Sequence, residues 1–569
     1  MEFSPSDSEQ DPLISNLRAK GGYRTLPFIV GVDTFEKMAS IGLMPNMILY
    51  LKSEYGMQNA RAVNILFLWS SATNFMPIIG AFLCDSFVGR FRMVSYGSMT
   101  SLLGMILLWL TTIQPRAPCH QVSESCRSPT TFELLVLYTS FALMSFGSGG
   151  VRSSSVALAV DQLSKREKEQ GILERFFNWY CLLSAGTTLL AMTFMVYIQD
   201  KLGWTVGFGV PVALMFISVA LFFLASPFYI KLKPKTNLFG GFAQVLVAAY
   251  KNRHLQLPSV VNYELYHNEK EHMFQIPSEK LRFLNKACFI RNPMHDLTPD
   301  GRASDPWSLC TVDQVEELKT LVRIIPIWTT GIMLSVNMSQ SSFLVLEASS
   351  MDRHVTPNFQ IPAGSFGSLM MVSLLFWIVL YDRIAIPLAS KIMGKPARLG
   401  VKQKMGIGLL SSCIAIGSLA VVESFRRAMA IKEGFSDDPQ AVVSMSALWL
   451  LPRQIFDGLA EASNIIGQSE FYLSELPQSM SSLGAVLFGV GSSAANLISS
   501  LILNIMNNVT ERGGEESWLA NNINKGHYDY YYWLICGLSF LNFLYYLYVS
   551  KAYGPCKGEE KKSLDGGDD

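Results

Sequence analysis

The feature that most restricts this chain is a long series of apolar stretches, each long enough to cross a lipid bilayer as a helix. A transmembrane helix needs about 20 apolar residues because the hydrocarbon core of a bilayer is about 30 Å thick. Of the 569 residues, 50% are hydrophobic and only 16% are charged, against about 25% charged residues in an ordinary soluble domain. The sequence therefore predicts an all-α membrane protein.

Twelve such stretches can be counted, and they fall into two sets of six. The longest connection, residues 232–317, separates the two sets. Six plus six spans with a long middle connection are typical of the major facilitator fold, in which twelve transmembrane helices form two six-helix bundles. The expected spans are 24–51, 62–84, 91–113, 133–160, 176–199, 205–231, 318–347, 364–390, 401–424, 441–472, 480–507 and 528–550.

This count divides the chain into five parts. A disordered cytosolic tail (1–22) precedes the first six-helix bundle (23–231), a cytosolic linker (232–317) leads to the second bundle (318–552), and another cytosolic tail (553–569) follows. The linker contains the stretch LFGGFAQVLVAAY, whose apolar face predicts an amphipathic helix that lies at the membrane interface or bridges the bundles.

Lysine and arginine gather in connections on one side of this topology, which the positive-inside rule places in the cytoplasm. Both termini are therefore expected to be cytoplasmic, and the plasma membrane is the expected location. The count puts Arg426, Arg427 and Lys432 in a connection on the opposite side, as an exception to the rule. The basic residues that set the orientation are Arg18, Lys20, Arg24, Arg90, Arg92, Lys165, Arg166, Lys168, Lys391, Lys395, Arg398, Lys402 and Lys404.

The first span contains Asp33, Glu36 and Lys37, three ionisable residues on one helical face. An ionised group at the centre of a bilayer costs at least about 2.5 kcal/mol, so each of them needs a partner, a cavity or a function. A carboxylate beside a cation that can approach or withdraw is suited to load and release a proton. We expect a proton-coupling site here, with a purely structural ion pair as the alternative.

Two further spans carry charges. Arg152 follows three glycines in the fourth span and is the expected partner of the carboxylates in the first span. In the tenth span, Arg453 and Asp457 are one turn apart and can neutralise each other. This pairing leaves Glu461 to face a cavity, where we expect it to contact substrate or a proton.

The seventh span offers uncharged polar groups, Asn337, Ser339 and Gln340, which are expected to line the substrate path. Between the second and third spans, GAFLCDSFVGRFR matches the loop pattern of the major facilitator proteins at Asp85 and Arg90. Cations in such a loop can bind the carbonyl groups at a helix end and nearby carboxylates. Asp85 and Arg90 are therefore expected to hold one conformation closed.

Several motifs together resemble a known family. They are FGSGGVRSSSVALAVDQL (146–163), FFNWYCLLSAG (176–186), WSLCTVDQVEELKTLVRIIPIW (307–328), MDR (351–353), FQIPAGS (359–365), YDR (381–383) and NNINKGHYDYYYWL (521–534). They are similar to signatures of the plant nitrate/peptide transporter family, within the proton-dependent oligopeptide transporter superfamily. The resemblance extends from about residue 22 to about residue 553.

The resemblance implies alternating access and proton-coupled import. The E-x-x-E-[RK] motif of the family appears here as Asp33-Thr34-Phe35-Glu36-Lys37, with Asp in place of the first Glu. The cation that the family carries in its fourth span falls on Arg152, and the glutamate in its tenth span falls on Glu461. These matches assign proton coupling to Asp33, Glu36, Lys37 and Arg152.

Two departures from the family pattern bear on the substrate. Nitrate-carrying members place a histidine in the seventh span to hold the anion, and Met338 occupies that position here. A threonine that acts as a phosphorylation switch in some members falls at Met93, so that switch is not expected. An anion would then be attracted by Arg152, by Lys37 or by polar groups such as Asn337 and Gln340.

The expected function is proton-coupled import of a small anion, with nitrate preferred. A hormone such as gibberellin, another organic acid or metabolite, and di- or tripeptides remain alternative substrates. Two other kinds of protein also remain alternatives: a passive channel or facilitator, and a receptor that has a transporter fold but does not transport. An ATP-driven pump is excluded because the chain lacks a G-x-x-x-x-G-K-[ST] loop. A net charge of +1 gives no sign of nucleic-acid binding, and the nine cysteines show no metal-binding spacing, so no cofactor or metal is expected. The oligomeric state is left open.

Overall fold

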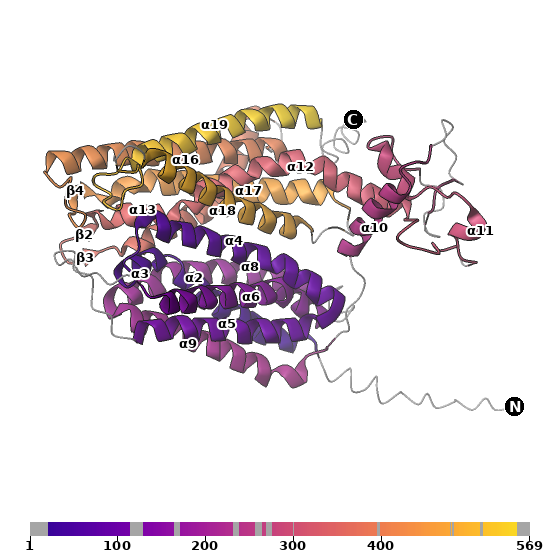
Figure 1. Ribbon diagram of the computed structural model, residues 1–569, viewed down its shortest axis with the longest axis horizontal. Helices are drawn as coiled ribbons and strands as arrows, with labels where there is room; N and C mark the ends of the chain where they lie inside the picture. Colours follow the sequence, from indigo (N-terminus) through magenta and orange to yellow (C-terminus); the bar gives the residue numbers. More distant parts are fainter. Residues whose placement is uncertain are drawn as a thin grey trace.

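The computed structural model is almost entirely helical, and its helices form two halves that lie side by side along their length (Figure 1). It describes residues 21–113, 129–163, 171–231, 238–256, 265–268, 276–299, 301–394, 399–477, 480, 483–511 and 516–554. The tails expected at 1–22 and 553–569 fall almost wholly outside these ranges.

The first half contains spans one to six. Span five runs into α9 and ends at Gly203, whose positive φ of 80° breaks the helix and lets span six turn back. Glycine takes this conformation readily because it has no Cβ. The elements are α2 (Leu26–Leu43) with α3 (Met47–Ser53), α4 (Asn59–Leu83), α5 (Arg90–Ile113), α6 (Thr131–Asp161), α8 (Ile172–Leu190) with the π-helical η3 (Ala191–Met195), and α9 (Val196–Leu224).

The second half contains spans seven to twelve. Its first helix, α12, begins at a capping box in which the side chains of Thr311 and Gln314 each accept a backbone N–H of the other residue. The elements are α12 (Val312–Ser339) with α13 (Ser341–Ser349), α14 (Phe366–Leu380) with η8 (Tyr381–Ala385) and α15 (Ile386–Met393), α16 (Val401–Lys432), α17 (Leu451–Glu475), α18 (Leu483–Thr510) and α19 (Tyr528–Tyr553).

The predicted major facilitator fold, with twelve spans in two bundles, is confirmed. Within the described residues, nine helical stretches are long and apolar enough to cross a membrane by length and composition alone. One of them, Arg175–Leu224, is 50 residues long and contains both span five and span six. The two remaining spans, α2 and α17, are the ones that carry the clusters of ionisable residues, which lower their mean hydropathy.

Two of the predicted boundaries are wrong. Span ten was expected from residue 441, but residues Val443–Ser446 form strand β4 and the helix α17 begins at Leu451. Span nine was expected to end at residue 424, but α16 continues to Lys432. Arg426 and Arg427 are therefore helical residues and not loop cations, and Arg426 is fully buried.

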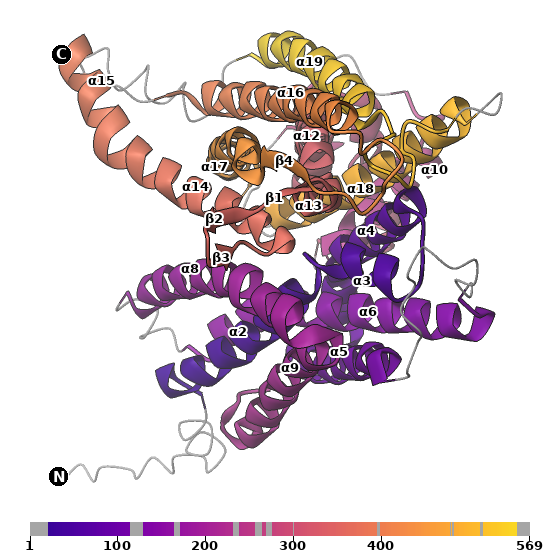
Figure 2. The same ribbon diagram turned by 90° about the vertical axis from the view of Figure 1, so that its left-hand side faces the viewer.

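Four short strands lie at one end of the molecule, called here the strand end, which faces the viewer in Figure 2. Strand β1 (Met351–Asp352) pairs in parallel with β4, with Met351 opposite Val443. Strand β2 (His354–Thr356) pairs in antiparallel fashion with β3 (Phe359–Gln360). These pairs connect the ends of spans seven, eight and ten.

The long middle connection lies at the opposite end, called here the linker end (Figure 1). Its apolar stretch forms helix α10 (Leu238–Lys251), as predicted. Buried residues of α10, including Val245 and Ala248, pack against the 3-10 helix η6 (Arg282–Ala287) and the start of α12, in one cluster with Val315. The linker therefore rests on the extension of span seven beyond the bundle. A short helix, α11 (Pro293–Asp296), lies further out.

Candidate functional site

Two adjoining cavities lie in the protein, the larger one where the halves meet and the smaller one within the first half. Their volumes are about 300 Å³ and about 190 Å³, and both are lined by Met44, Ser70 and Asn74. The larger cavity is further lined by Pro45, Leu66, Phe67, Met192, Ser335, Met338, Ser339, Ser341, Ser342, Val345, Gly364, Gly367, Glu461, Phe488, Ser492 and Asn496. The smaller cavity is further lined by Ser40, Ile41, Trp69, Thr73, Met105, Met144, Ser148 and Arg152.

Interruptions in two spans place residues in the larger cavity. Span one is interrupted between α2 and α3, and Met44 and Pro45 lie in that gap. Span seven is interrupted at Gln340, and Ser339 and Ser341 lie on either side of it. Interrupted helices at membrane depth are tolerated where they border a cavity, because polar groups there can find partners.

The smaller cavity, called here the chamber, contains one cation among polar and apolar side chains. Of the residues that line the two cavities in the described part of the chain, Arg152 is the one basic residue. Hydroxyl and amide groups line one part of the chamber, and the apolar side chains of Ile41, Met44, Trp69, Met105 and Met144 line the rest. The polar groups come from Ser40 of α2, from Ser70, Thr73 and Asn74 of α4, and from Ser148 of α6. A guanidinium group with hydroxyl donors nearby is suited to bind an oxyanion.

The three ionisable residues of span one form a connected group. The Lys37 ammonium lies 2.8 Å from Asp33 Oδ2 and donates to the Tyr180 hydroxyl at 2.7 Å and the Ser184 hydroxyl at 3.0 Å. Asp33 also accepts a hydrogen bond from Ser155 at 3.0 Å. Lys37 is thereby held between α2 and α8 and is absent from the lining of both cavities in this conformation, and its contact with substrate stays a prediction.

Glu36 is fully buried in the same group. Its Oε1 accepts a hydrogen bond from Ser40 at 2.8 Å, while its Oε2 has no hydrogen-bond partner among the described residues. Arg152 faces this carboxyl group, but the pair does not form an ion pair within 4.0 Å. The predicted direct pairing of Arg152 with the carboxylates of span one is therefore wrong in this conformation. Lys37 takes Asp33 instead, because the two are one helical turn apart.

The tenth span has the predicted arrangement. Arg453 Nε lies 3.2 Å from Asp457 Oδ2, and both side chains are buried. Glu461, one turn further along, lines the larger cavity. Met338 of α12 lines the same cavity, at the position where the family pattern has a histidine in nitrate-carrying members.

Asn337 and Gln340 do not line either cavity in this conformation, and their contact with substrate stays a prediction. The Asn337 amide donates to the Ser412 hydroxyl at 2.8 Å and accepts from Ser539 at 3.0 Å. The Gln340 side chain accepts from Tyr531 at 3.1 Å. Both residues point into the second bundle because adjacent positions on a helix face about 100° apart.

The loop motif between spans two and three lies at the linker end. Arg90 Nη1 lies 2.6 Å from Asp161 at the end of α6 and donates to the Ala157 carbonyl at 3.3 Å, whereas its Nε lies 4.0 Å from Asp85. The basic residue therefore binds a helix-end carbonyl and a carboxylate. Its stronger partner is Asp161, with Asp85 at the limit of an ion pair. The gating role of Asp85 and Arg90 stays a prediction.

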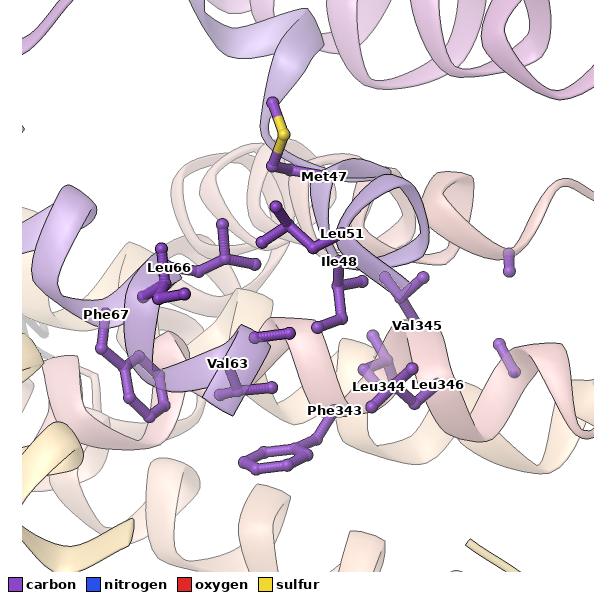
Figure 3. Close-up of a cluster of buried hydrophobic side chains, with 14 of the residues drawn as sticks. Met47, Ile48, Leu51, Val63, Leu66, Phe67, Phe343, Leu344, Val345 and Leu346 are labelled. Atoms are coloured by element: carbon purple, nitrogen blue, oxygen red, sulfur yellow. The ribbon is translucent and has the colours of Figure 1, made fainter. Parts of the chain in front are cut away.

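Apolar side chains close the site toward the strand end. In Figure 3, Met47, Ile48 and Leu51 of α3, with Val63 of α4, lie near the residues Phe343–Leu346 of α13 from the other half. Asn59 adds polar contacts between the halves, because its amide donates to the Tyr528 hydroxyl at 3.0 Å and to the Asn521 carbonyl at 3.1 Å. Access from the strand end is therefore blocked in this conformation.

Sequence reasoning missed two sets of residues. The polar lining of α4 (Ser70, Thr73 and Asn74) is uncharged and could not be told from ordinary helix contacts. Glu347 and Glu423 were placed at the ends of predicted spans, although both are fully buried. The signal that could have found them is their charge within an apolar stretch. Among the described residues, no group of three metal-binding side chains comes together.

The chain was compared with known proteins. A family model described as the POT family matches residues 91–519. Two Arabidopsis thaliana proteins, NRT1/PTR family 1.2 and NRT1/PTR family 1.1, are each 50% identical to this chain, and the alignments cover 98% of this chain and 94% and 96% of those proteins.

Solved structures share the fold. A crystal structure of an auto-inhibited POT family peptide transporter has a TM-score of 0.69 at 18% identity, covering 94% of this chain and 98% of that chain. A POT family transporter in complex with 5-aminolevulinic acid has a TM-score of 0.61 at 12% identity, covering 95% of this chain and 100% of that chain. At such identities these structures establish the fold alone.

Proposed function

The chain belongs to the POT family, a family of membrane transporters and not of enzymes, and from this premise we propose that it is a proton-coupled symporter importing a small anion, nitrate first, by alternating access. The observation that carries the choice of an anion is the chamber of about 190 Å³ around Arg152. A cation surrounded by hydroxyl groups offers an oxyanion both charge and directed hydrogen bonds. The carboxyl group of Glu36, which Arg152 faces, is the candidate proton carrier.

Proton coupling draws support from the burial of Glu36. An ionised carboxylate removed from water is costly unless it is paired and hydrogen-bonded, and Glu36 Oε2 has no partner among the described residues. Binding a proton removes that cost. When the proton leaves, the Arg152 guanidinium that faces Glu36 can pair with the carboxylate in place of the anion, which links proton release to anion release.

The driving force is sufficient for an anion. One elementary charge moving inward releases about 2.3 kcal/mol per 100 mV, and each unit of pH difference adds about 1.36 kcal/mol per proton. Two protons with one monovalent anion carry a net positive charge inward, so the membrane potential then favours uptake.

An organic carboxylate such as gibberellin is a second candidate, and the larger cavity favours it. That cavity has about 300 Å³ of space and is lined by Met44, Met192, Met338 and Phe488 among other residues. An apolar body could rest there while the carboxylate group lies beside Arg152, since the two cavities share lining residues. Cavities of this size are typical of sites for organic ligands.

The proposed orientation places the linker end in the cytoplasm. The basic residues Lys402 and Lys404 begin α16 at this end, and Lys404 pairs with Glu470 at 2.7 Å. A cytoplasmic linker end follows from the positive-inside rule. Since the strand end is closed, the conformation described here would release substrate to the cytoplasm. The plasma membrane is the proposed location.

The test is uptake by purified protein in liposomes, with labelled nitrate, gibberellin and a dipeptide offered in turn at acidic external pH. We expect nitrate uptake that stops when a protonophore collapses the gradient. Arg152→Gln should reduce uptake at low nitrate by about 10- to 100-fold, since a hydrogen bond to a charged group contributes about 1.5–3 kcal/mol. Arg323→Gln is the matched control, because Arg323 lies over the Tyr553 ring and outside both cavity linings.

Other outcomes would reject the proposal in distinct ways. Uptake of the dipeptide alone would rule out the nitrate assignment. Flux that is unchanged without a proton gradient would indicate a passive facilitator. Ligand binding without flux, in the wild type and in Glu461→Ala alike, would indicate a receptor.

A further inference from the structure

A second group of buried charges lies at the strand end of the second half, and none of its members lines either cavity. Four helices contribute to it: α13, α16, α17 and α19. The proposed transport mechanism uses none of its members. The buried ionisable residues of the group are Glu347, Glu423, Arg426, Arg453, Asp457 and Asp529.

Glu423 and Arg426 satisfy each other. Arg426 Nε and Nη2 donate to the two carboxyl oxygens of Glu423 at 2.7 Å and 2.8 Å. The remaining donors of Arg426 bind Asn524 Oδ1 at 2.6 Å and the Ile523 carbonyl at 2.8 Å. Four of the five N–H donors of this guanidinium group are therefore engaged, and one Nη1 hydrogen is left.

Two of the three guanidinium nitrogens of Arg453 donate hydrogen bonds. Its Nε pairs with Asp457 at 3.2 Å and its Nη2 donates to the Asn337 carbonyl at 3.3 Å. Its Nη1 is buried and has no hydrogen-bond partner among the described residues. Arg453 is one of the charged groups that face Glu347.

Glu347 is the least satisfied member: both of its carboxyl oxygens lack a partner among the described residues, whereas Asp529 lacks one for Oδ1 only. The side chain of Glu347 is 0% exposed. The Tyr532 hydroxyl of α19 faces it without the distance and alignment of a formed hydrogen bond. The charged groups facing it are Glu423 and Arg426 of α16 and Arg453 of α17.

The charges of the group do not balance. Four buried carboxyl groups stand against two buried arginines, and the partly buried Arg427, which contacts His527 at 3.0 Å, adds a third. Burial and the neighbouring Arg427 lower the pKa of His527, so it adds no charge at neutral pH. With every carboxyl group ionised, at least one negative charge stays unpaired in a low-dielectric interior, which is strongly unfavourable.

We propose that Glu347 is a second proton-binding site of this transporter, in the opposite half of the molecule from Glu36. A protonated Glu347 carries no charge and gains an O–H donor, which the carboxylate of Glu423 or the oxygen of Tyr532 can accept. A metal cation is a poorer occupant than a proton, because two guanidinium groups face the site. Arg453 supplies the means of release, since its free Nη1 can bind the carboxylate once the proton leaves.

This inference rests on the proposed symport and accounts for its stoichiometry. One proton with one monovalent anion moves no net charge, whereas two protons with one anion move one positive charge inward. A proton site in each half gives the two protons that uptake against a negative membrane potential requires.

A direct test needs no substrate. Infrared spectra of the purified full-length protein report the carbonyl stretch of a protonated carboxyl group, which an ionised group lacks. We expect wild type to show such a band at neutral pH and Glu347→Gln, which keeps size and shape, to lose it. Glu36→Gln is the matched control and should leave the Glu347 contribution in place. Identical spectra of wild type and Glu347→Gln would overturn the assignment.

A second variant, Tyr532→Phe, tests the same assignment if Glu347→Gln does not fold. It leaves the carboxyl group in place and removes the hydroxyl that faces it, so the same band should shift. A band that does not move would count against Glu347 as its source.

The transport readout is the number of charges moved per nitrate, from current and tracer uptake measured together. Wild type should move about one positive charge per nitrate, and Glu347→Gln should move about none while tracer exchange continues. An unchanged ratio would overturn the second site and leave the symport intact. An absence of nitrate uptake in wild type would instead reject the proposed function, and the infrared result would still decide the proton site.

Discussion

At the scale of single residues, the surroundings of a polar side chain decide its role more than its type. Asn337 and Met338 are neighbours on α12, yet the amide is buried against Ser412 and Ser539 while the thioether lines the cavity. Glu36 and Glu461 are both acidic residues in spans, but Glu36 is sealed in the first bundle and Glu461 borders open space. A charged residue in a span indicates a candidate site, and the packing of the helices determines whether its side chain is buried or lines a cavity.

His527 carries a prediction at this scale. It lies just before α19 and stacks on Tyr530, with Arg427 beside it. Burial, and then the charge of Arg427, lower its pKa below the ordinary value of 6.5. The unfolded chain therefore binds the proton more readily than the folded one, so His527 makes the protein less stable as the pH falls through 6.5.

The measurement is the thermal unfolding midpoint in detergent at pH values from about 7 down to about 5, the range in which histidine charges. His527→Gln should lose less stability over this range than wild type. His254→Gln, in the linker, is a control that should follow wild type. A steeper loss in His527→Gln would contradict the sign of the effect.

At the scale of elements, glycines set how closely spans three and four can pack. The contact between α5 and α6 brings Gly97 and Gly147 together, and a Cβ on Gly147 would lie 2.3 Å from the Ser101 backbone nitrogen. Small residues at such positions let transmembrane helices approach closely, which is how they gain packing energy in the absence of a hydrophobic driving force. The close contact fixes α6, and with it Arg152, against its neighbours.

Gly147→Ala should therefore destabilise the protein by about 1–3 kcal/mol, the usual cost of overpacking, because backbone atoms on α5 would have to move. Gly186→Ala in α8 is the matched control, since nothing lies within 4 Å of a Cβ placed there. Unfolding midpoints in detergent compare the two variants. Equal midpoints would show that α5 and α6 can move apart enough to accommodate the added methyl group at little cost in stability.

At the scale of the whole molecule, the two halves meet along α4 and α18 and are closed at the strand end (Figure 2). Hydrogen bonds join these helices directly: Ser71 and Ser493 have hydroxyl oxygens 2.9 Å apart, and Ser500 donates to Asn64 at 2.5 Å. Alternating access requires the halves to rotate about the site between them. Contacts across this interface must therefore rearrange in each transport cycle.

A cross-link at this interface should arrest transport. Replacing Ser71 and Ser493 with cysteine puts two sulfur atoms close to the separation of about 2.0 Å that a disulfide needs. We expect oxidation of Ser71→Cys/Ser493→Cys to stop nitrate flux and a reductant to restore it. Each single variant controls for the nine natural cysteines. Undiminished flux in protein shown to be cross-linked would mean that this contact does not move.

The sequence by itself determined the class of fold and the twelve spans, and it marked the intramembrane charges that are candidates for the proton and anion sites. It could do so because crossing a bilayer demands about 20 apolar residues and makes every intramembrane charge conspicuous. It also predicted the Arg453–Asp457 pair and the exposure of Glu461 to the cavity, since both follow from helical spacing.

Only the tertiary structure decided which partner each of those residues takes. Lys37 binds Asp33 and Tyr180 and leaves Arg152 in the chamber, and Asn337 and Gln340 turn away from the cavities. Glu347 has no hydrogen-bond partner among the residues that the structure describes. Helical periodicity gives the face on which a side chain lies, but the element opposite that face is set by packing between spans that are far apart in the sequence. The physical cost of an unpaired buried charge then identifies Glu347 as a site.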